Sequence, residues 1–395
     1  MSISKNIKVM LSTSSWIRRM FEEGARLKKK YGAENVFDFS LGNPNLVPPE
    51  QFTSALKAIV CSTEKTTSHG YMSNAGYPHV RKSVSDYISA EQQIQLSETE
   101  ILMTCGAAGA LNVILKTLLD SGDEVVAPSP YFVEYDAYVA NHGGLLKTVP
   151  VNDDFTLNID RISNAIAVGT KAVLINSPNN PTGQIYSETC LKQLGELLEK
   201  KGKEFGHVIY LISDEPYRKI VYEGASVPSI FSCYSNSIIA SSYSKDLSIP
   251  GERIGFIAVH PEAAYKQDLI DGMAISNRIL GFVNAPALIQ QVVASIQGAS
   301  VDVAVYQRKR DLLCDGLADC GYQFIRPPGA FYVFPKTPIP DDVEFVRALQ
   351  EELILVVPGS GFGGPGHFRI AYCVDDNTII NSIPGFRKVL QRYSR

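Results

Sequence analysis

A lysine and an arginine stand eight positions apart in SSYSKDLSIPGERIG (residues 241–255), directly after an apolar run that is typical of a buried strand. A lysine at such a strand end, partly desolvated and near another cation, has a lowered pKa and can act as an amine nucleophile toward an aldehyde. Lys245 is therefore a candidate for Schiff-base chemistry, with Arg253 as the nearby cation. Taken alone, a solvated loop lysine is the more common alternative.

An acidic residue ends the strand-like run that precedes this segment. VIYLISDEPY (208–217) carries an apolar strand straight into Asp214, which predicts a carboxylate at the carboxyl end of a central strand, where α/β folds build sites. A buried acid needs a partner, and a protonated pyridine nitrogen would supply one, because the ion pair keeps the ring able to accept electrons. The alternative for Asp214 is the N-cap of a helix that follows the strand.

A third segment has the composition of an anion site. MTCGAAGAL (103–111) is a turn of small residues between a strand and an amphipathic helix, so the backbone amides of Gly106, Ala107 and Ala108 can approach a phosphate at the helix N-terminus. Close packing of helix on sheet would explain the same small residues. Arg253 adds a planar set of donors that suits a phosphate, and a surface ion pair is its alternative.

A second arginine is predicted inside a strand. Arg369 alternates with Phe368 and Ile370, and an unpaired guanidinium is costly in such an apolar setting. A carboxylate that binds both arms of the guanidinium would remove this cost, and an amino-acid substrate provides one. Pairing with an internal acid is the alternative.

These residues must be positioned by a sheet whose strands alternate with helices. Short β-branched runs separated by helix-length segments predict an α/β fold with a mostly parallel sheet covered by helices on both faces. The runs are EVVA (124–127), LLKTVP (145–150), KAVLIN (171–176), VIYLIS (208–213), SIIASS (237–242) and GFIAVH (255–260). The sheet is predicted to belong to a large domain of residues 48–285.

The two ends of the chain follow another pattern. We expect a surface helix over 15–31 with Ser14 or Ser15 as its cap, one long helix over 285–317 and a final helix over 377–393. Short strands are expected over 323–325, 330–335 and 368–373. Because these strands are too few for a second doubly wound sheet, residues 1–47 and 286–395 are predicted to form a smaller α+β domain.

Composition narrows the classes of function. The chain has 37 lysines and arginines against 41 acidic residues, a net charge of −4, so no long-range basic field favours nucleic acid or anionic lipid as a partner. No apolar stretch reaches the roughly 18 residues of a membrane span, and residues 1–15 lack a leader pattern, which predicts a cytoplasmic protein. Seven scattered cysteines and six dispersed histidines argue against a metal site or a disulfide framework.

SYSKDLSIPGERIG (242–255) resembles the lysine signature of the class I/II aminotransferases, aspartate aminotransferase-like pyridoxal 5′-phosphate enzymes of fold type I. Other landmarks of that family occur in order between residues 36 and 375, namely LGNP (41–44), SPYF (129–132), NPTG (180–183), DEPY (214–217) and FRIAY (368–372). The resemblance implies the fold-type I architecture and pyridoxal 5′-phosphate as cofactor, joined to Lys245. It also implies a small-molecule amino acid and a 2-oxo acid as substrates.

By the same resemblance, four residues hold the cofactor ring. Asn180 and Tyr217 would contact its phenolic oxygen, and Asp214 would hold its ring nitrogen. Phe132 would stack on the ring, and core packing is the alternative for this side chain. The Asn180–Pro181 peptide bond is a candidate for the cis form, which the sequence alone leaves open.

The remaining implied contacts concern the phosphate and the substrate. Ser242 and Arg253 would bind the phosphate, and Arg369 the substrate α-carboxylate, to which Gly42 adds a backbone contact. Tyr71, in HGYMSNAGYPHVRKSV (69–84), would reach the phosphate of a neighbouring subunit, which predicts a homodimer. An ordinary loop tyrosine is the alternative.

The hypothesis is an aminotransferase of amino-acid biosynthesis that moves an amino group from an L-amino acid to a 2-oxo acid by a ping-pong Schiff-base mechanism, with Lys245 as the base. A carbon–sulfur lyase or another non-transaminase on the same fold is an alternative, because the cofactor supports several outcomes. A non-catalytic cofactor-binding regulator is a further one. A dinucleotide-dependent oxidoreductase, suggested by GSGFGG (359–364), is disfavoured because a strand rather than a helix is predicted next.

Substrate choice stays open in the sequence. NAPALIQQVV (284–293) contains no arginine, whereas dicarboxylate-specific members of the resembling family carry one soon after this segment. A preference for aspartate is therefore not predicted. Arg18 or Arg19 on the first helix could serve as a substitute cation.

Overall fold

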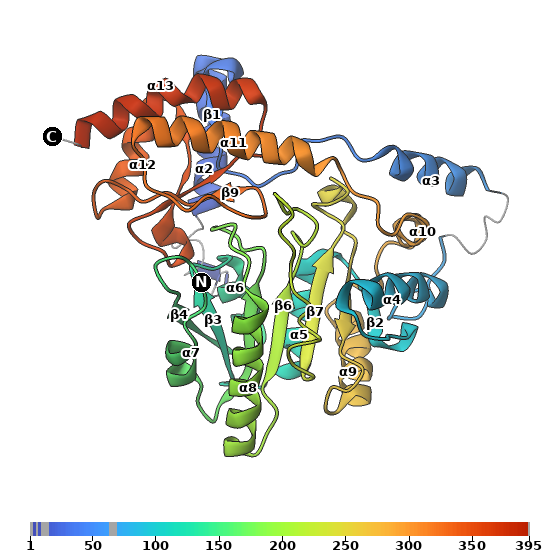
Figure 1. Ribbon diagram of the computed structural model, residues 1–395. Helices are drawn as coiled ribbons and strands as arrows, with labels where there is room; N and C mark the ends of the chain where they lie inside the picture. The colour runs from blue at the N-terminus through green and yellow to red at the C-terminus, as the bar shows by residue number, and fades with distance from the viewer. Residues whose placement is uncertain (1–2, 5–6, 9–15, 63–68, 394–395) are drawn as a thin grey trace.

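The computed structural model describes residues 3–4, 7–8, 16–62 and 69–393, arranged around a central seven-stranded sheet (Figure 1). The strand order is β2-β8-β7-β6-β5-β3-β4, and of these seven described strands only β8 runs antiparallel to its neighbours. The bounds are β2 Ile101–Thr104, β3 Glu124–Ser129, β4 Leu145–Pro150, β5 Thr170–Asn176, β6 Tyr210–Asp214, β7 Ser237–Ser242 and β8 Gly255–Val259. The predicted mostly parallel sheet is confirmed.

Both faces of the sheet are buried, as the continuous apolar runs require. In β5, Val173 packs into one hydrophobic cluster and Leu174 into another, and in β6 Leu211 and Ile212 divide in the same way. Successive side chains of a strand point to opposite faces, so the two clusters lie on the two sides of the sheet.

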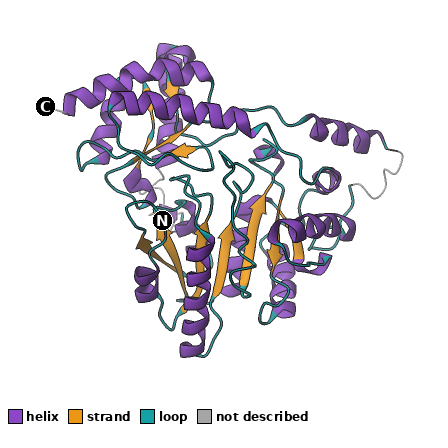
Figure 2. Cartoon of the chain, viewed as in Figure 1, coloured by secondary structure: helices purple, strands orange, loops and turns teal. Residues whose placement is uncertain are grey.

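Helices cover each face (Figure 2). The first cluster contains side chains of α3 (Glu50–Cys61), α4 (Pro78–Gln92), α7 (Ile159–Ala165), α8 (Glu188–Phe205) and α10 (Ala287–Ser295). The second contains side chains of α5 (Gly106–Leu118), α6 (Glu134–Ala140) and α9 (Lys266–Ile279). The sheet is thus the middle layer of three, with its carboxyl-end loops facing the rest of the chain.

The two ends of the chain pack together above those loops (Figure 1). Strand β1 (Phe37–Asp38) pairs in parallel with β10 (Ile354–Leu355), and β11 (Val357–Pro358), β12 (Phe368–Ala371) and β9 (Tyr332–Val333) form an antiparallel sheet. The helices of this part are α2 (Trp16–Tyr31), α11 (Val303–Cys320), α12 (Asp342–Glu351) and α13 (Asp376–Tyr393). Four short 3₁₀ turns complete the described elements, namely η1 (Ala33–Asn35), η2 (Glu98–Glu100), η3 (Pro250–Glu252) and η4 (Gly359–Phe362).

Three details differ from the sequence predictions. The single helix expected over 285–317 is two helices, because Gly298 adopts a φ of 84° and the side chain of Asp302 caps α11 by accepting from the backbone N–H of Ala304. The expected strand over 323–325 is not a strand in the described chain, and the one over 330–335 is only the two residues of β9. GSGFGG lies mostly in the turn η4, and the expected caps Ser14 and Ser15 lie outside the described residues.

The division into a large domain of residues 48–285 and a small domain of 1–47 with 286–395 remains a prediction. Helix α10 packs into the first cluster of the central sheet through Ile289, Val292 and Val293, whereas Val301 and α11 pack into a third cluster with the chain ends. The packing therefore favours a boundary between these two helices.

Within the described residues, no helix is long and apolar enough to cross a membrane, and no three metal-binding side chains form a group that could hold an ion. All seven cysteines are described and are free thiols.

Candidate active site

A cavity of about 310 Å³ lies where β5, β6 and β7 end. The last residue of each of these strands, Asn176, Asp214 and Ser242, lines it. Because parallel strands end at the same edge of a sheet, residues far apart in sequence meet there. Eleven of the predicted site residues line this cavity, namely Gly42, Ala107, Ala108, Phe132, Asn180, Asp214, Tyr217, Ser242, Lys245, Arg253 and Arg369.

Lys245 lies in the turn after β7, with its Nζ donating to the carbonyl oxygen of Gly42 at 3.0 Å. Burial lowers the pKa of Lys245 to about 8; the Cys373 thiol opposes this shift, and the nearby cations Arg253 and Arg369 add to it. The amine is therefore poised to lose its proton near neutral pH, as the sequence analysis expected of a desolvated lysine.

Asp214 ends β6 and is almost completely buried. Its Oδ2 accepts a hydrogen bond of 2.6 Å from the hydroxyl of Tyr135, whereas its buried Oδ1 has no partner among the described residues. Burial raises the pKa of Asp214 to about 7; the bond from Tyr135 opposes this shift and the neighbouring Glu215 adds to it. The N-cap alternative is wrong, because a turn and then β7 follow the strand.

Arg369, in β12, is buried with its guanidinium between the rings of Tyr332 and Phe362, at 4.8 and 4.7 Å from their centres. Nη1 donates to Asn180 Oδ1 at 3.0 Å and Nη2 to the carbonyl of Ser40 at 2.5 Å. Its Nε has no partner in the described part of the chain, and burial lowers the pKa of the guanidinium. No described acid forms an ion pair with Arg369, although the Glu134 carboxyl lies within electrostatic reach of it, so the buried guanidinium can still take a carboxylate.

The small-residue turn opens α5 directly beside Arg253. Gly106 is the first residue of α5 and has a φ of 73°, and a Cβ on it would lie 2.8 Å from Arg253 Nη2. The guanidinium donates to two backbone carbonyls, those of Pro250 at 3.0 Å and Cys105 at 3.4 Å. The partners of this guanidinium are uncharged, so its positive charge is not neutralised by them. A helix N-terminus beside such an arginine suits an anion such as a phosphate.

Other side chains explain how the cavity is shaped. Tyr217 shares a 2.7 Å hydrogen bond with the hydroxyl of Tyr332, and Phe132 contacts the edge of Tyr135 at 5.6 Å between ring centres. Gly42 is required by close approach, because a Cβ there would lie 2.0 Å from the Tyr332 hydroxyl. The Asn180–Pro181 peptide bond is cis.

Two of the predicted site residues do not line the cavity, and several residues that do line it were not predicted from the sequence. Gly106 lies behind Arg253, and Tyr71 is 92% exposed in the isolated chain. The missed residues include Asn176, Glu134, Tyr138, Ser244 and Tyr332, together with Tyr135 behind Asp214. Asn176 had a usable signal, because it ends a predicted strand just as Asp214 does. The aromatic residues had none, since aromatic side chains in such runs usually pack in cores.

The side chains of Arg18 and Arg19 lie outside what the structure describes. The described cations on the cavity wall are Lys245, Arg253 and Arg369.

Comparison with known proteins identifies the family. The model of the family named aminotransferase class I and II matches residues 34–383. The chain belongs to this family. It is 30% identical over 366 residues to a probable aspartate aminotransferase of Methanocaldococcus jannaschii, which covers 90% of this chain and 94% of that protein.

Solved structures agree with this assignment. An aminotransferase from Eubacterium rectale has a TM-score of 0.97 to this chain, with 39% identity and complete coverage of both chains. The aspartate aminotransferase of Thermus thermophilus, solved with maleate, has a TM-score of 0.87 at 28% identity and covers 99% of this chain and 100% of its own. The protein is thus a pyridoxal-phosphate-dependent aminotransferase with the fold-type I architecture.

The cavity fits this cofactor by the chemistry of its donors and acceptors. The unpartnered Oδ1 of Asp214 is a buried acceptor that suits a protonated ring nitrogen. Lys245 offers an amine of lowered pKa, and Arg253 beside the α5 N-terminus offers donors for a phosphate. These three features are what an aldehyde-bearing pyridine phosphate needs from a protein.

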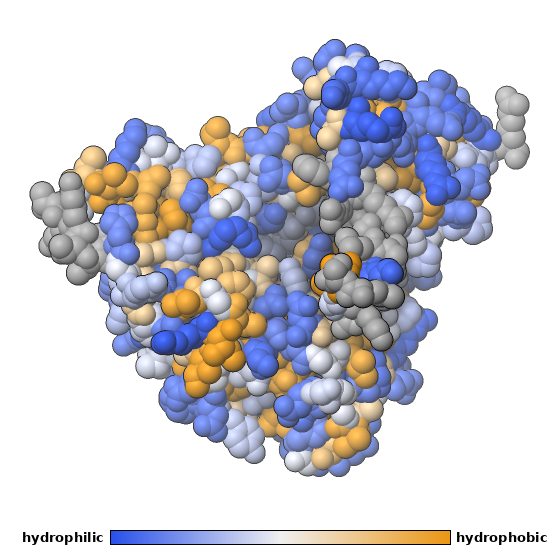
Figure 3. Space-filling model, turned by 180° about the vertical axis from the view of Figure 1, so that it is seen from behind, coloured by the Kyte–Doolittle hydropathy of each residue, from blue (hydrophilic) through white to orange (hydrophobic). Residues whose placement is uncertain are grey.

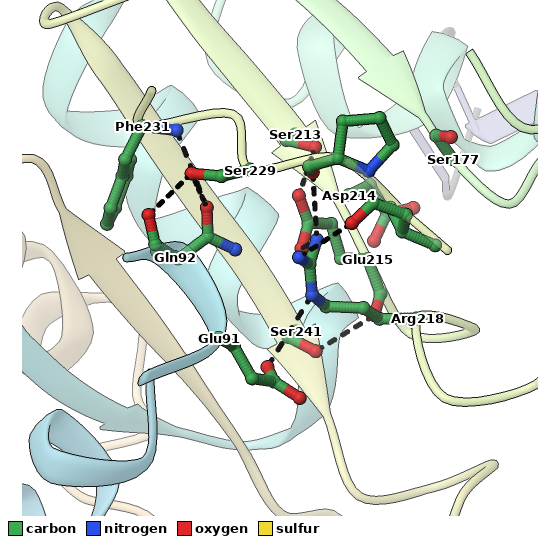
Figure 4. A network of polar contacts seen from close by, with 12 residues as sticks. Glu91, Gln92, Ser177, Ser213, Asp214, Glu215, Arg218, Ser229, Phe231 and Ser241 are labelled. Atoms are coloured by element: carbon green, nitrogen blue, oxygen red, sulfur yellow. Dashed lines mark hydrogen bonds and ion pairs between the residues drawn. The ribbon is translucent and has the colours of Figure 1, made fainter. Parts of the chain in front are cut away.

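A partly buried ion-pair network holds the loop that follows Asp214 (Figure 4). Arg218 lies between two acids, with Nη1 2.9 Å from Glu215 Oε2 and Nε 3.5 Å from Glu91 Oε2. Glu215 also accepts a bond of 2.7 Å from Ser213, and its carbonyl accepts one of 3.0 Å from Ser241 in β7. Because Glu215 is directly next to Asp214, this network anchors the backbone that carries the site carboxylate.

The raised pKa of Asp214 predicts how the stability of the cofactor-free protein depends on pH. The folded chain holds a proton on Asp214 up to about pH 7, whereas the carboxyl of the unfolded chain has its ordinary value of 3.8. The folded state binds more protons between these values, so its free energy of unfolding should fall as pH rises from about 4 to about 7 and then level off.

Urea titrations at a series of pH values measure this effect as the difference between the wild type and Asp214→Asn, which still accepts the bond from Tyr135. The asparagine variant should lose less stability than the wild type over this pH range. Identical pH slopes for the two proteins would contradict the raised pKa.

Removing the central cation of the network should destabilise the protein. Arg218→Met leaves Glu215 buried without a cation, which should cost about 3–5 kcal/mol in free energy of unfolding by denaturant titration. Adding Glu215→Gln to that variant should recover much of the loss, and Arg347→Met, at an exposed position of α12, should change little. A double variant no more stable than Arg218→Met would refute the role of this pair.

Proposed function

We propose that this aminotransferase uses Lys245 as its proton-transferring amine and Asp214 as the partner of the cofactor ring nitrogen. The observation that carries the proposal is that one cavity is lined both by the amine of lowered pKa and by the carboxylate with an unpartnered buried oxygen. Bound pyridoxal 5′-phosphate supplies an aldehyde that takes up amino groups and a ring that withdraws electrons from the substrate.

The chain's own residues would divide the work around the ring. Lys245 Nζ takes a proton from the substrate α-carbon, because its lowered pKa leaves much of the amine neutral near pH 8. Asp214 Oδ1 accepts the ring N–H, while Tyr135 holds Oδ2 in place. Asn180 and Tyr217 hold the phenolic oxygen, and Phe132 covers the ring face.

The phosphate and the substrate would occupy opposite ends of the cavity wall. The backbone amides of residues 106–108, with Ser242 and Arg253, bind the phosphate. Arg369 binds the α-carboxylate of an L-amino acid or a 2-oxo acid, with Asn180 and the backbone of Gly42 beside it. A substrate carboxylate would give the buried guanidinium the anion that no described side chain provides.

We also propose that the active unit is a homodimer in which Tyr71 contributes to the neighbouring site. Tyr71 is almost fully exposed, and three large apolar side chains of α3 and α9 are more than half exposed, namely Val60, Ile275 and Ile279. Apolar surface is visible on the side of the molecule that carries α3 (Figure 3). A self-complementary interface through this side would bury these residues and complete two sites at once. A cytoplasmic location and a biosynthetic role stay predictions.

Lys245→Ala tests the catalytic proposal. The variant should lose turnover by at least about a hundredfold, because the proton transfer has no base, and should lose the borohydride-reducible link to the cofactor that mass spectrometry detects in the wild type. Lys336→Ala, at an exposed lysine outside this cavity, is the matched control. A panel of amino donors is scored by release of 2-oxo acid; release of ammonia or sulfide instead would favour a lyase. Full turnover by Lys245→Ala would disprove the proposal.

Tyr71→Phe tests the shared site. Loss of one hydrogen bond to a charged phosphate should weaken retention of the cofactor by roughly tenfold or more, measured by equilibrium dialysis. Tyr265→Phe, at another exposed tyrosine, should leave retention unchanged. A monomer by light scattering, or unchanged cofactor affinity in Tyr71→Phe, would rule the shared site out.

A further inference from the structure

One charged residue on the cavity wall has no part in the proposed reaction. The described wall contains two acids, Asp214 and Glu134, and three cations, Lys245, Arg253 and Arg369. Asp214 and the three cations have the roles given above. Glu134 has no such role. A carboxylate on the wall of a substrate cavity nevertheless affects which ligands can bind there.

Glu134 faces the same space as the residue assigned to the substrate carboxylate. It is the first residue of α6, is partly buried, and its Oε2 is fully covered and without a hydrogen-bond partner in the described ranges. Burial raises the pKa of the Glu134 carboxyl, while its own backbone N–H and the charge of Arg369 lower it. The same carboxyl helps to raise the pKa of Tyr138, for which burial is the main cause. The carboxyl is therefore within electrostatic reach of Arg369 and Tyr138.

This position has a consequence for the substrate side chain. Arg369 would fix the α-carboxylate, so a side chain that extends along the wall toward Glu134 meets an acid to which no described residue is joined in an ion pair. A second carboxylate there would face the Glu134 carboxylate in a poorly solvated space, which is unfavourable. An amide or ammonium group would instead donate a hydrogen bond to it.

The described wall offers no compensating charge for a dicarboxylate. Each of its three cations is already assigned, to the phosphate, to the α-carboxylate or to the proton transfer. The names of the relatives include aspartate, but the charges on this wall favour a different side chain.

We infer that Glu134 is a specificity-determining residue that selects amino acids whose side chain ends in a hydrogen-bond donor, either an amide or an ammonium group, and rejects those that end in a carboxylate. The inference rests on the proposed function, because it takes Arg369 as the site of the α-carboxylate. A purely structural role for Glu134 at the start of α6 would affect all substrates alike.

Near-isosteric ligand pairs separate these two roles. Glutamine and glutamate differ by one donor group, so the ratio of their kcat/KM values in the holoenzyme reports on Glu134 while common effects on the cofactor cancel. Ornithine against norleucine repeats the comparison for an ammonium group. The variant is Glu134→Gln, and the control is Asp136→Asn, at an exposed residue of the same helix that does not line the cavity.

The wild type should favour glutamine over glutamate and ornithine over norleucine by about tenfold or more. Glu134→Gln should reduce both ratios of kcat/KM by at least about tenfold. Asp136→Asn should leave both ratios unchanged. A wild-type preference for glutamate, or the same ratios in Glu134→Gln, would overturn the inference.

A binding measurement keeps this test independent of turnover. Glutarate and glutaramate carry the same two end groups but lack the amino group, so calorimetry on the holoenzyme gives their dissociation constants without a reaction. Glutaramate should bind more tightly to the wild type, and the difference should shrink in Glu134→Gln. Failure of every amino donor to react would count against the proposed function, whereas equal binding of the two acids would count against Glu134.

Discussion

A carboxylate buried at the end of the central strand, with one oxygen held and the other open, is the feature on which this molecule depends. Asp214 is kept out of water by a sheet that is covered on both faces, and Tyr135 satisfies only one of its oxygens. An uncompensated buried acid is expensive, and its pKa rises until a proton or a cationic partner arrives. A pyridine nitrogen that carries its own proton is such a partner, so this site costs stability when empty and gains it when the cofactor binds.

The same logic applies to the cations around the cavity. Arg369 and Arg253 bond mainly to neutral carbonyl and amide oxygens, and Lys245 donates to a backbone carbonyl. None of these bonds neutralises charge. The described wall therefore presents positive groups that can bind a phosphate and a carboxylate. In such a poorly solvated space, hydrogen bonds to charged groups are strong. Two acids, Asp214 and Glu134, also line the described wall, and Glu134 is the one that the proposed cofactor contacts leave without a role.

The site also joins the two parts of the chain. Arg369 comes from the sheet of the chain ends, and Asn180 and Asp214 come from the central sheet. The segment that follows β1 passes between them, where its Gly42 carbonyl accepts from Lys245 and leaves no room for a side chain beside Tyr332. Small shifts between the two parts would change the distance from the carboxylate site to the base.

The sequence by itself determined the alternation of strands and helices along the chain, the family, and the residues whose chemistry is unusual for their setting. Lys245, Asp214 and Arg369 could be recognised because a charged residue within an apolar run or just after one is rare and needs a reason. The tertiary structure alone decided where the helix over 285–317 breaks, which face of the cavity Glu134 and Tyr138 occupy, and that Tyr135 holds Asp214. Such facts depend on contacts between residues far apart in the chain, and an aromatic or acidic residue in a helix carries the same local pattern whether it faces a substrate or solvent.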